Sequence, residues 1–206
     1  MVTIKTSKEI ELLREGGRRL AFVLHEVAKR VEPGISTKEL DDYARKLIKE
    51  GGDKPSFLNY KPQGADYPYP CALCTSLNAE VVHGVPNKDR ILKEGDIISI
   101  DCGLEHKGLY TDMALTVPVV KIDKEIKKLL KVTREALHVG IAAARGGSYV
   151  GDIGAAIENF VKLHGFGIVR VLAGHGVGHA VHEDPYVPNF GKKGEGEKLK
   201  PGMVWP

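Results

Sequence analysis

The chain has 206 residues, a length that fits one large domain or two small ones. Hydrophobic residues make up 42% and charged residues 28% of it, which is ordinary for a globular protein in water. The 30 basic and 27 acidic residues leave a net charge of +3, and no Lys/Arg-rich block is present. This balance argues against a protein that binds nucleic acid or a membrane surface.

The cysteines and the N-terminal segment indicate the compartment. Three cysteines are too few for a disulfide framework, and the pair Cys71 and Cys74 has zinc-site spacing but no second pair downstream. Free thiols in a reducing compartment are the favoured interpretation. The first residues are amphipathic and charged, unlike a signal peptide, and no apolar run approaches the roughly 20 residues that span a bilayer. We therefore expect a cytoplasmic protein.

Two amphipathic helices are predicted in the first part of the chain. The first begins at Ser7, carries its apolar residues on one face, and ends before Pro33-Gly34. The second is predicted to be capped by Thr37 and to end at Gly51-Gly52.

A second helical pair repeats this pattern. A long helix is predicted over residues 124–144, and a shorter one ends at His164-Gly165. Shifting the sequence by 113 residues places Leu40 on Ile153, which predicts a weak internal repeat with halves at about 7–120 and 123–206.

Each helical pair precedes a predicted strand region and a histidine in a turn. In the first half, residues 74–77 lead into 81–84, and in the second half, residues 168–171 lead into 174–176. Strands alternating with long helices in this way favour an α+β domain.

A hairpin with two carboxylates lies between the halves. Residues 97–103 and 109–117 are predicted strands, and a turn centred on His106-Lys107 would place Asp101 directly opposite Asp112. Two facing carboxylates repel each other, and a buried ionised carboxylate is costly unless it is paired or bound to a metal. A shared proton, a basic partner or a divalent cation would resolve the conflict. The alternative is that one Asp points outward or caps a turn.

The eight histidines fall into two groups. Four stand alone in predicted helices or turns and are interpreted as surface or packing residues: His25, His106, His138 and His164. The other four lie in the motifs VHGVP and GHGVGHAVHEDP. Glycines flank His175, where a neutral imidazole would suit a first-row divalent metal. His182 could contact substrate, and His179 is interpreted as a supporting or surface residue.

The motifs SIDCG, TDMA, GHGVGHAVHEDP and LKPGMV, in this order and spacing, resemble the methionine aminopeptidases. These are pita-bread metallopeptidases, as are aminopeptidase P, prolidase and creatinase. CTSLNAEVVHGVP is similar to the type I form. The resemblance implies an α+β pita-bread fold, in which two pseudo-symmetric halves place helices over a central antiparallel sheet. It covers residues 1–206, which we expect to form one catalytic domain.

The same resemblance implies roles for single residues. Asp101 would be a bidentate metal ligand, Asp112 a ligand bridging two metals, and His175 the one histidine ligand. His83 and His182 would hydrogen-bond the scissile amide and stabilise its developing charge. The pocket for the methionine side chain would include Tyr69, Cys74 and Val181, the last at a position where some members have Phe.

The activity implied is metal-dependent removal of the N-terminal methionine from nascent polypeptides, with cobalt, manganese, iron(II) or zinc as the metal and the ribosome as an associated partner. The family completes its metal centre with two glutamates that follow the GMV motif, whereas here Trp205 and Pro206 follow it. We therefore expect a C-terminally truncated domain without its closing strands, one metal ion rather than two, and weak activity. The chain would be a monomer or a homodimer through the truncated edge.

Two alternatives remain within this fold. One is a non-catalytic module that binds peptides or proteins, which would have no need for the full set of Asp and His residues. The other is a proline-specific aminopeptidase, which the HGVP context disfavours.

Overall fold

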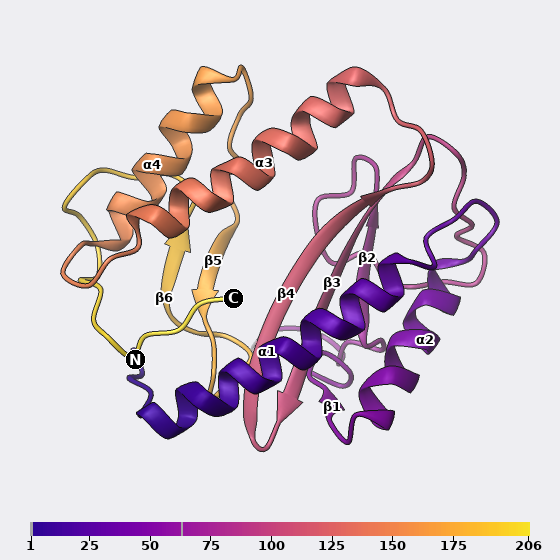
Figure 1. Cartoon of the computed structure of the whole chain (residues 1–206), viewed down its shortest axis with the longest axis horizontal. Coiled ribbons are helices and arrows are strands. Elements are labelled where there is room, and N and C mark those ends of the chain that lie inside the picture. The colour runs from indigo at the N-terminus through magenta and orange to yellow at the C-terminus, as the bar shows by residue number, and fades with distance from the viewer. Residues whose placement is uncertain (1, 63) are drawn as a thin grey trace. The chain divides into compact units, whose positions relative to one another are not determined.

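The computed structural model describes residues 2–62 and 64–206, which form two compact units (Figure 1). Unit 1 comprises Met1–Ser7, Lys124–Gly178 and His182–Pro206, and unit 2 comprises Lys8–Asp123 and His179–Val181. In chain order the elements are α1 (Ser7–Ala28), α2 (Thr37–Glu50), β1 (Lys54–Pro55), β2 (Leu73–Leu77), β3 (Ile97–His106), β4 (Leu109–Pro118), α3 (Lys124–Ala143), α4 (Val150–Leu163), β5 (Ala173–Gly176) and β6 (Glu183–Pro188). Within these described residues no helix has both the length and the apolar character needed to cross a membrane.

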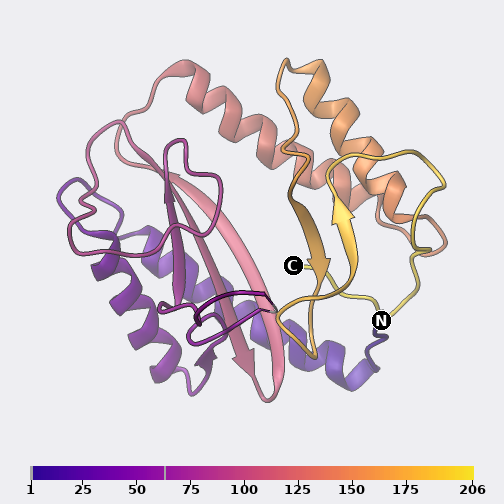
Figure 2. The same cartoon turned by 180° about the vertical axis from the view of Figure 1, so that it is seen from behind.

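Unit 2 is built on an antiparallel sheet with β3 at its centre. β2 and β1 pair with one edge of β3, and β4 pairs with the other edge. Figures 1 and 2 show α1 and α2 on one face of this sheet. The predicted apolar face of α1 is confirmed, since Leu20, Val23 and Leu24 are buried in the core against the sheet. Burial of such apolar surface is the main stabilising contribution to this unit.

The start of α2 differs from the prediction by one residue. Ser36, not Thr37, is the N-cap: its hydroxyl accepts from the Glu39 backbone N–H at 3.2 Å. The Glu39 carboxylate in turn accepts from the Ser36 backbone N–H at 2.9 Å, which completes a capping box. Thr37 is the first helical residue, and its hydroxyl donates to the Asn87 carbonyl at 3.1 Å. The predicted cap, Thr37, was wrong by one position, because Ser and Thr side chains can both accept the backbone hydrogen bond of an N-cap.

The β3–β4 hairpin turns one residue later in the chain than predicted, which shifts each cross-strand partner by two residues. His106 pairs with Leu109, so the turn residues are Lys107 and Gly108, with φ of 52° and 82°. A two-residue hairpin turn with both φ values positive matches the twist of the strands, and glycine adopts this conformation without strain. The predicted centre at His106-Lys107 was therefore wrong. Asp112 lies opposite Gly103, not opposite Asp101.

Unit 1 combines a helical pair with a short hairpin. α3 packs on α4, α4 packs on β6, and β5 and β6 pair antiparallel. The predicted strand at residues 168–171 was wrong, since the strand begins at Ala173. Val171 is 91% exposed, so this apolar run has no partner strand, and strand propensity without pairing does not make a strand.

The second helix of each predicted half has the same length. α2 and α4 each have 14 residues, and their first residues, Thr37 and Val150, are separated by the predicted 113. The residue before each helix forms an isolated antiparallel bridge, Ser36 with Ile91 and Tyr149 with Lys198.

Candidate functional site

Asp101 and Asp112 lie on the same face of the β3–β4 hairpin. The register difference of two residues keeps both side chains on one face, because side chains alternate along a strand. Burial raises the pKa of Asp112 to about 6, while hydrogen bonds with Asp101 and with the Met113 backbone act in the opposite direction. The predicted juxtaposition of the two carboxylates is thus confirmed, as diagonal rather than direct neighbours. When both carboxylates are ionised, they repel each other. A divalent cation bound between them would offset this repulsion.

His175 and His182 meet in unit 1 at the two sides of the β5–β6 hairpin. Their ring centroids are 4.4 Å apart, with an angle of 55° between the planes. His175 Nδ1 lies 2.9 Å from the Gly176 carbonyl oxygen. Because a carbonyl only accepts, Nδ1 carries the proton and the lone pair of the neutral ring is on Nε2, the arrangement of a metal-binding histidine.

His182 borders a small pocket within unit 1. The pocket has a volume of about 240 Å³ and is lined by His182, Glu183, Asp184 and Tyr186. The His182 side chain is exposed, which is the situation expected of a group that meets a substrate.

His83 lies in the loop after β2, in unit 2, with a positive φ of 59°. The next residue fixes the loop against the strand, since Thr75 N–H donates to the Gly84 carbonyl at 2.7 Å and Gly84 N–H donates to Ser76 Oγ at 3.2 Å. A Cβ atom at Gly84 would lie 2.2 Å from the Thr75 carbonyl oxygen, so only glycine allows this approach. The backbone around the exposed His83 is therefore held in place.

The three predicted pocket residues belong to one apolar cluster of unit 2. Cys74 and Val181 are buried together with Phe57, and Tyr69, Tyr60 and Tyr110 pack against them. Tyr69 donates its hydroxyl to the Leu73 and Gly84 carbonyls at 2.9 and 3.2 Å. Burial raises the pKa of the Cys74 thiol to about 12, so the thiol stays neutral. All three cysteines are buried free thiols.

Asp41 is a residue that the sequence analysis missed. It has no exposed surface, and its Oδ1 accepts from the Ala72 and Leu73 backbone N–H groups at 2.8 and 3.0 Å. Arg45 Nε lies 2.9 Å from the other oxygen. Asp41 thus fixes the segment that leads from Tyr69 into β2. Its spacing in the sequence could have indicated that it is buried. Asp41 falls on the same helix face as the buried residues Thr37, Ala44 and Ile48.

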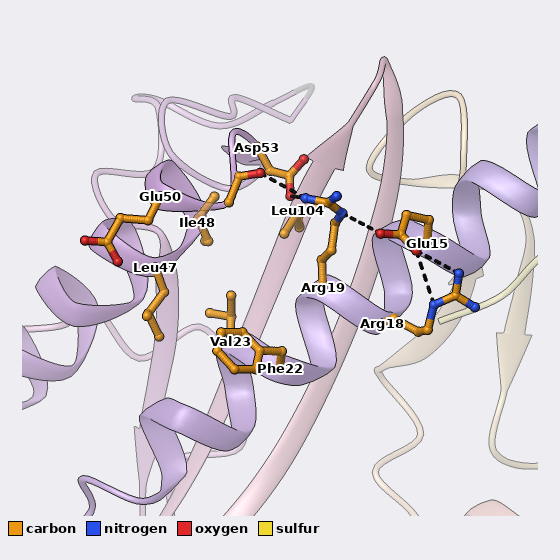
Figure 3. Close-up of a pocket in the computed structure, with 11 residues that line it drawn as sticks. Glu15, Arg18, Arg19, Phe22, Val23, Leu47, Ile48, Glu50, Asp53 and Leu104 are labelled. Atoms are coloured by element: carbon orange, nitrogen blue, oxygen red, sulfur yellow. Dashed lines mark hydrogen bonds and ion pairs between the residues drawn. The ribbon is translucent and has the colours of Figure 1, made fainter.

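His106 is not the isolated residue that was predicted. It is buried, and its Nδ1 lies 2.7 Å from Asp53 Oδ1, while Arg19 reaches the other Asp53 oxygen at 3.4 Å. Asp53 also borders a groove of about 470 Å³ between α1 and α2, where Arg18 and Arg19 pair with Glu15 (Figure 3). The described residues that line this groove include none of the predicted site residues. The groove is therefore separate from the candidate chemistry.

His179 has a contact with α1. His179 pairs with Glu9 of α1 at 2.8 Å and is partly exposed, as predicted for a surface residue. Within either unit, no group of three or more His, Cys, Asp or Glu side chains among the described residues is positioned to hold a metal ion. The carboxylate pair belongs to unit 2 and the histidine pair to unit 1.

Known proteins resemble the chain over nearly its whole length. Residues 11–206 match the model of metallopeptidase family M24. Methionine aminopeptidase 1 of Bacillus subtilis is 44% identical over 204 residues, which are 99% of this chain and 79% of that protein. Methionine aminopeptidase of Aquifex aeolicus is 45% identical over 207 residues, covering 98% and 80% of the two chains.

A solved structure shows the same fold. The crystal structure of methionine aminopeptidase from Thermotoga maritima superposes with a TM-score of 0.93 at 40% identity, covering 98% of this chain and 79% of that one. The expected pita-bread fold is confirmed by this agreement.

Proposed function

The chain belongs to the methionine aminopeptidases of metallopeptidase family M24, and we propose that it removes the N-terminal methionine of nascent proteins and peptides by metal-dependent hydrolysis. The observation that carries the proposal is the Asp101–Asp112 pair, in which burial raises the pKa of Asp112 to about 6. Two carboxylates that resist joint ionisation are suited to a divalent cation, and the family is one of metallopeptidases.

Asp101, Asp112 and His175 are the proposed metal ligands. The donor set of two carboxylates and one imidazole fits the first-row divalent ions, namely cobalt, manganese, iron(II) or zinc. Three ligands suffice for one ion, which we propose as the minimum content. When bound, the metal would act as a Lewis acid on the substrate carbonyl and would lower the pKa of a coordinated water. His175 contributes Nε2, because its Nδ1–H donates to the Gly176 carbonyl.

His83 and His182 are the proposed amide-binding residues. Both side chains are exposed, and each is attached to a backbone that is fixed by packing or pairing. An imidazole N–H that donates to the scissile amide would stabilise the charge that develops during attack. The preorganised backbones reduce the cost of holding the rings in place.

Tyr69, Cys74 and Val181 are the proposed walls of the methionine pocket. Their cluster is apolar, and the Cys74 thiol is neutral because burial raises its pKa to about 12. An unbranched, polarizable thioether fits such a surface. Substrates are proposed to be polypeptides with an N-terminal methionine as they emerge from the ribosome in the cytoplasm.

Hydrolysis of a Met-Ala-Ser peptide, with excess manganese or cobalt, tests the proposal. We expect methionine release by the natural chain, and a fall of at least about 100-fold in kcat/KM for Asp112→Asn, which keeps the shape but removes a ligand charge. Asp89→Asn, an exposed carboxylate in a turn, serves as the matched control and should keep the activity.

Two results would contradict the proposal. A folded protein that binds no divalent metal by elemental analysis would indicate the non-catalytic binding module. Preference for Xaa-Pro over Met-Ala peptides would indicate a proline-specific enzyme.

A further inference from the structure

A buried lysine near the start of the chain contacts the hairpin that carries both histidines of unit 1. Lys5 Nζ lies 2.5 Å from Glu183 Oε2, and the exposed fractions of the two side chains are 1% and 5%. Lys5 also donates to Thr3 Oγ1 at 2.5 Å, and Thr3 donates to the same Glu183 oxygen. A lysine is rarely buried to this degree unless its charge is paired.

Glu183 lies next to the backbone positions of both histidines in the hairpin. It follows His182 in the sequence and pairs across the hairpin with Gly176, which follows His175. A Cβ atom at Gly176 would lie 2.5 Å from the Asp184 carbonyl oxygen, so the two strands are in close contact here. Any movement of Glu183 would therefore displace the backbone beside both rings.

The segment that carries Lys5 is itself anchored within unit 1. Lys5 N–H donates to the Gly202 carbonyl at 2.8 Å, and Figures 1 and 2 show the start of the chain beside the yellow C-terminal segment. Val177 N–H donates to the Val204 carbonyl at 3.1 Å. Residues 202–204 thus contact both Lys5 and Val177, which directly follows β5. Glu183 pairs with the last residue of β5 across the hairpin and contacts Lys5.

We propose that Lys5 is a positioning residue for the proposed reaction: its ammonium group holds Glu183, and thereby fixes the orientation of His175 and His182. This inference rests on the proposed function for the role of the two rings. A buried ion pair adds little net stability, because desolvation of both charges offsets their attraction. The Lys5–Glu183 ion pair instead favours one arrangement of the hairpin. This matters for catalysis, because an imidazole ring displaced by about 1 Å loses much of its contribution to the reaction rate.

The test compares Lys5→Met and Glu183→Gln with the double variant Lys5→Met/Glu183→Gln. Each single variant removes one charge of the buried ion pair and is expected to be less stable, whereas the double variant removes both charges. We expect the double variant to fold, as judged by circular dichroism. With saturating metal its kcat should be at least about 10-fold below that of the natural chain, and its KM within about 2-fold. Lys29→Met, which removes an exposed lysine paired with Glu26, is the matched control and should keep both constants.

A second readout separates this inference from the proposed function. The ¹⁵N and ¹H NMR signals of the His175 and His182 rings should shift in the folded double variant. A double variant with wild-type kcat, or with unchanged ring signals, overturns the inference, because the ion pair would then serve stability alone. If the natural chain does not cleave Met peptides, the proposed function fails, and the ring signals still decide whether Lys5 positions the hairpin.

Discussion

Single buried charges fix the backbone near the candidate site. Asp41 is fully buried and accepts two backbone hydrogen bonds from the segment between Tyr69 and β2. Lys5 and Glu183 have a corresponding position at the β5–β6 hairpin. In both cases the charged group contacts residues far away in the sequence, and removing it leaves buried polar groups without a partner.

At Asp41 we predict a large loss of stability. Asp41→Ala should lower the free energy of unfolding by about 3 kcal/mol, because two buried N–H groups lose their acceptor and the partly buried Arg45 loses its ion-pair partner. Its neighbour Asp42, which is 58% exposed and pairs only with Lys38 among the described partners, is the matched control. Asp42→Ala should change the free energy by less than about 1 kcal/mol. Urea unfolding measures both values, and equal effects would contradict the prediction.

At the scale of the elements, the β3–β4 hairpin decides how the two aspartates meet. The positive φ values of Lys107 and Gly108 set the turn, and the turn sets the register over both strands. The register places Asp101 opposite Ala114 and Asp112 opposite Gly103. A register error of one residue would move one carboxylate to the other face, whereas an error of two residues keeps both on the same face.

For this turn we predict a glycine-specific effect. Gly108→Ala should destabilise the protein by about 1 kcal/mol, because its φ of 82° is strained for a residue with a Cβ atom. Gly17 in α1 has helical geometry and no atom within 4 Å of a built Cβ. Gly17→Ala should therefore stabilise the protein, by up to about 1 kcal/mol. Thermal unfolding measures both, and effects of the same sign would contradict the prediction.

At the scale of the whole molecule, the chain is divided between two units that each contain part of the proposed chemistry. Unit 2 contains Asp101, Asp112, His83 and the apolar cluster, and unit 1 contains His175 and His182. The first residues of the chain belong to unit 1, together with its last residues. Unit 1 therefore combines segments that are far apart in the sequence.

Metal removal should destabilise the folded protein. A ligand present at 100 times its dissociation constant stabilises the folded state by about 2.7 kcal/mol, if it does not bind the unfolded chain. For a chain of this size, that corresponds to a rise in Tm of roughly 5–10 °C. We expect EDTA to lower Tm and manganese to restore it in the natural chain, with no response to manganese in Asp112→Asn. An equal response in both proteins would contradict the proposed ligand set.

The sequence by itself determined the helices, the carboxylate hairpin and the residues that resemble the family's site. These depend on local patterns: apolar spacing for α1, glycines around His175, and two aspartates in apolar strands. The capping residue and the hairpin register were each predicted with a small error, because neighbouring residues of similar chemistry compete for the same turn or cap.

Only the tertiary structure decided where the buried charges find their partners. Asp41 with Ala72 and Leu73, His106 with Asp53, and Lys5 with Glu183 are contacts between distant parts of the chain. It also showed that residues 168–171 form no strand, since a strand requires a partner that the local sequence does not specify. The spacing of apolar residues in the sequence indicates which face of a helix or strand is buried. The partner of a buried charge is determined only by the packing of distant segments, which local spacing does not specify.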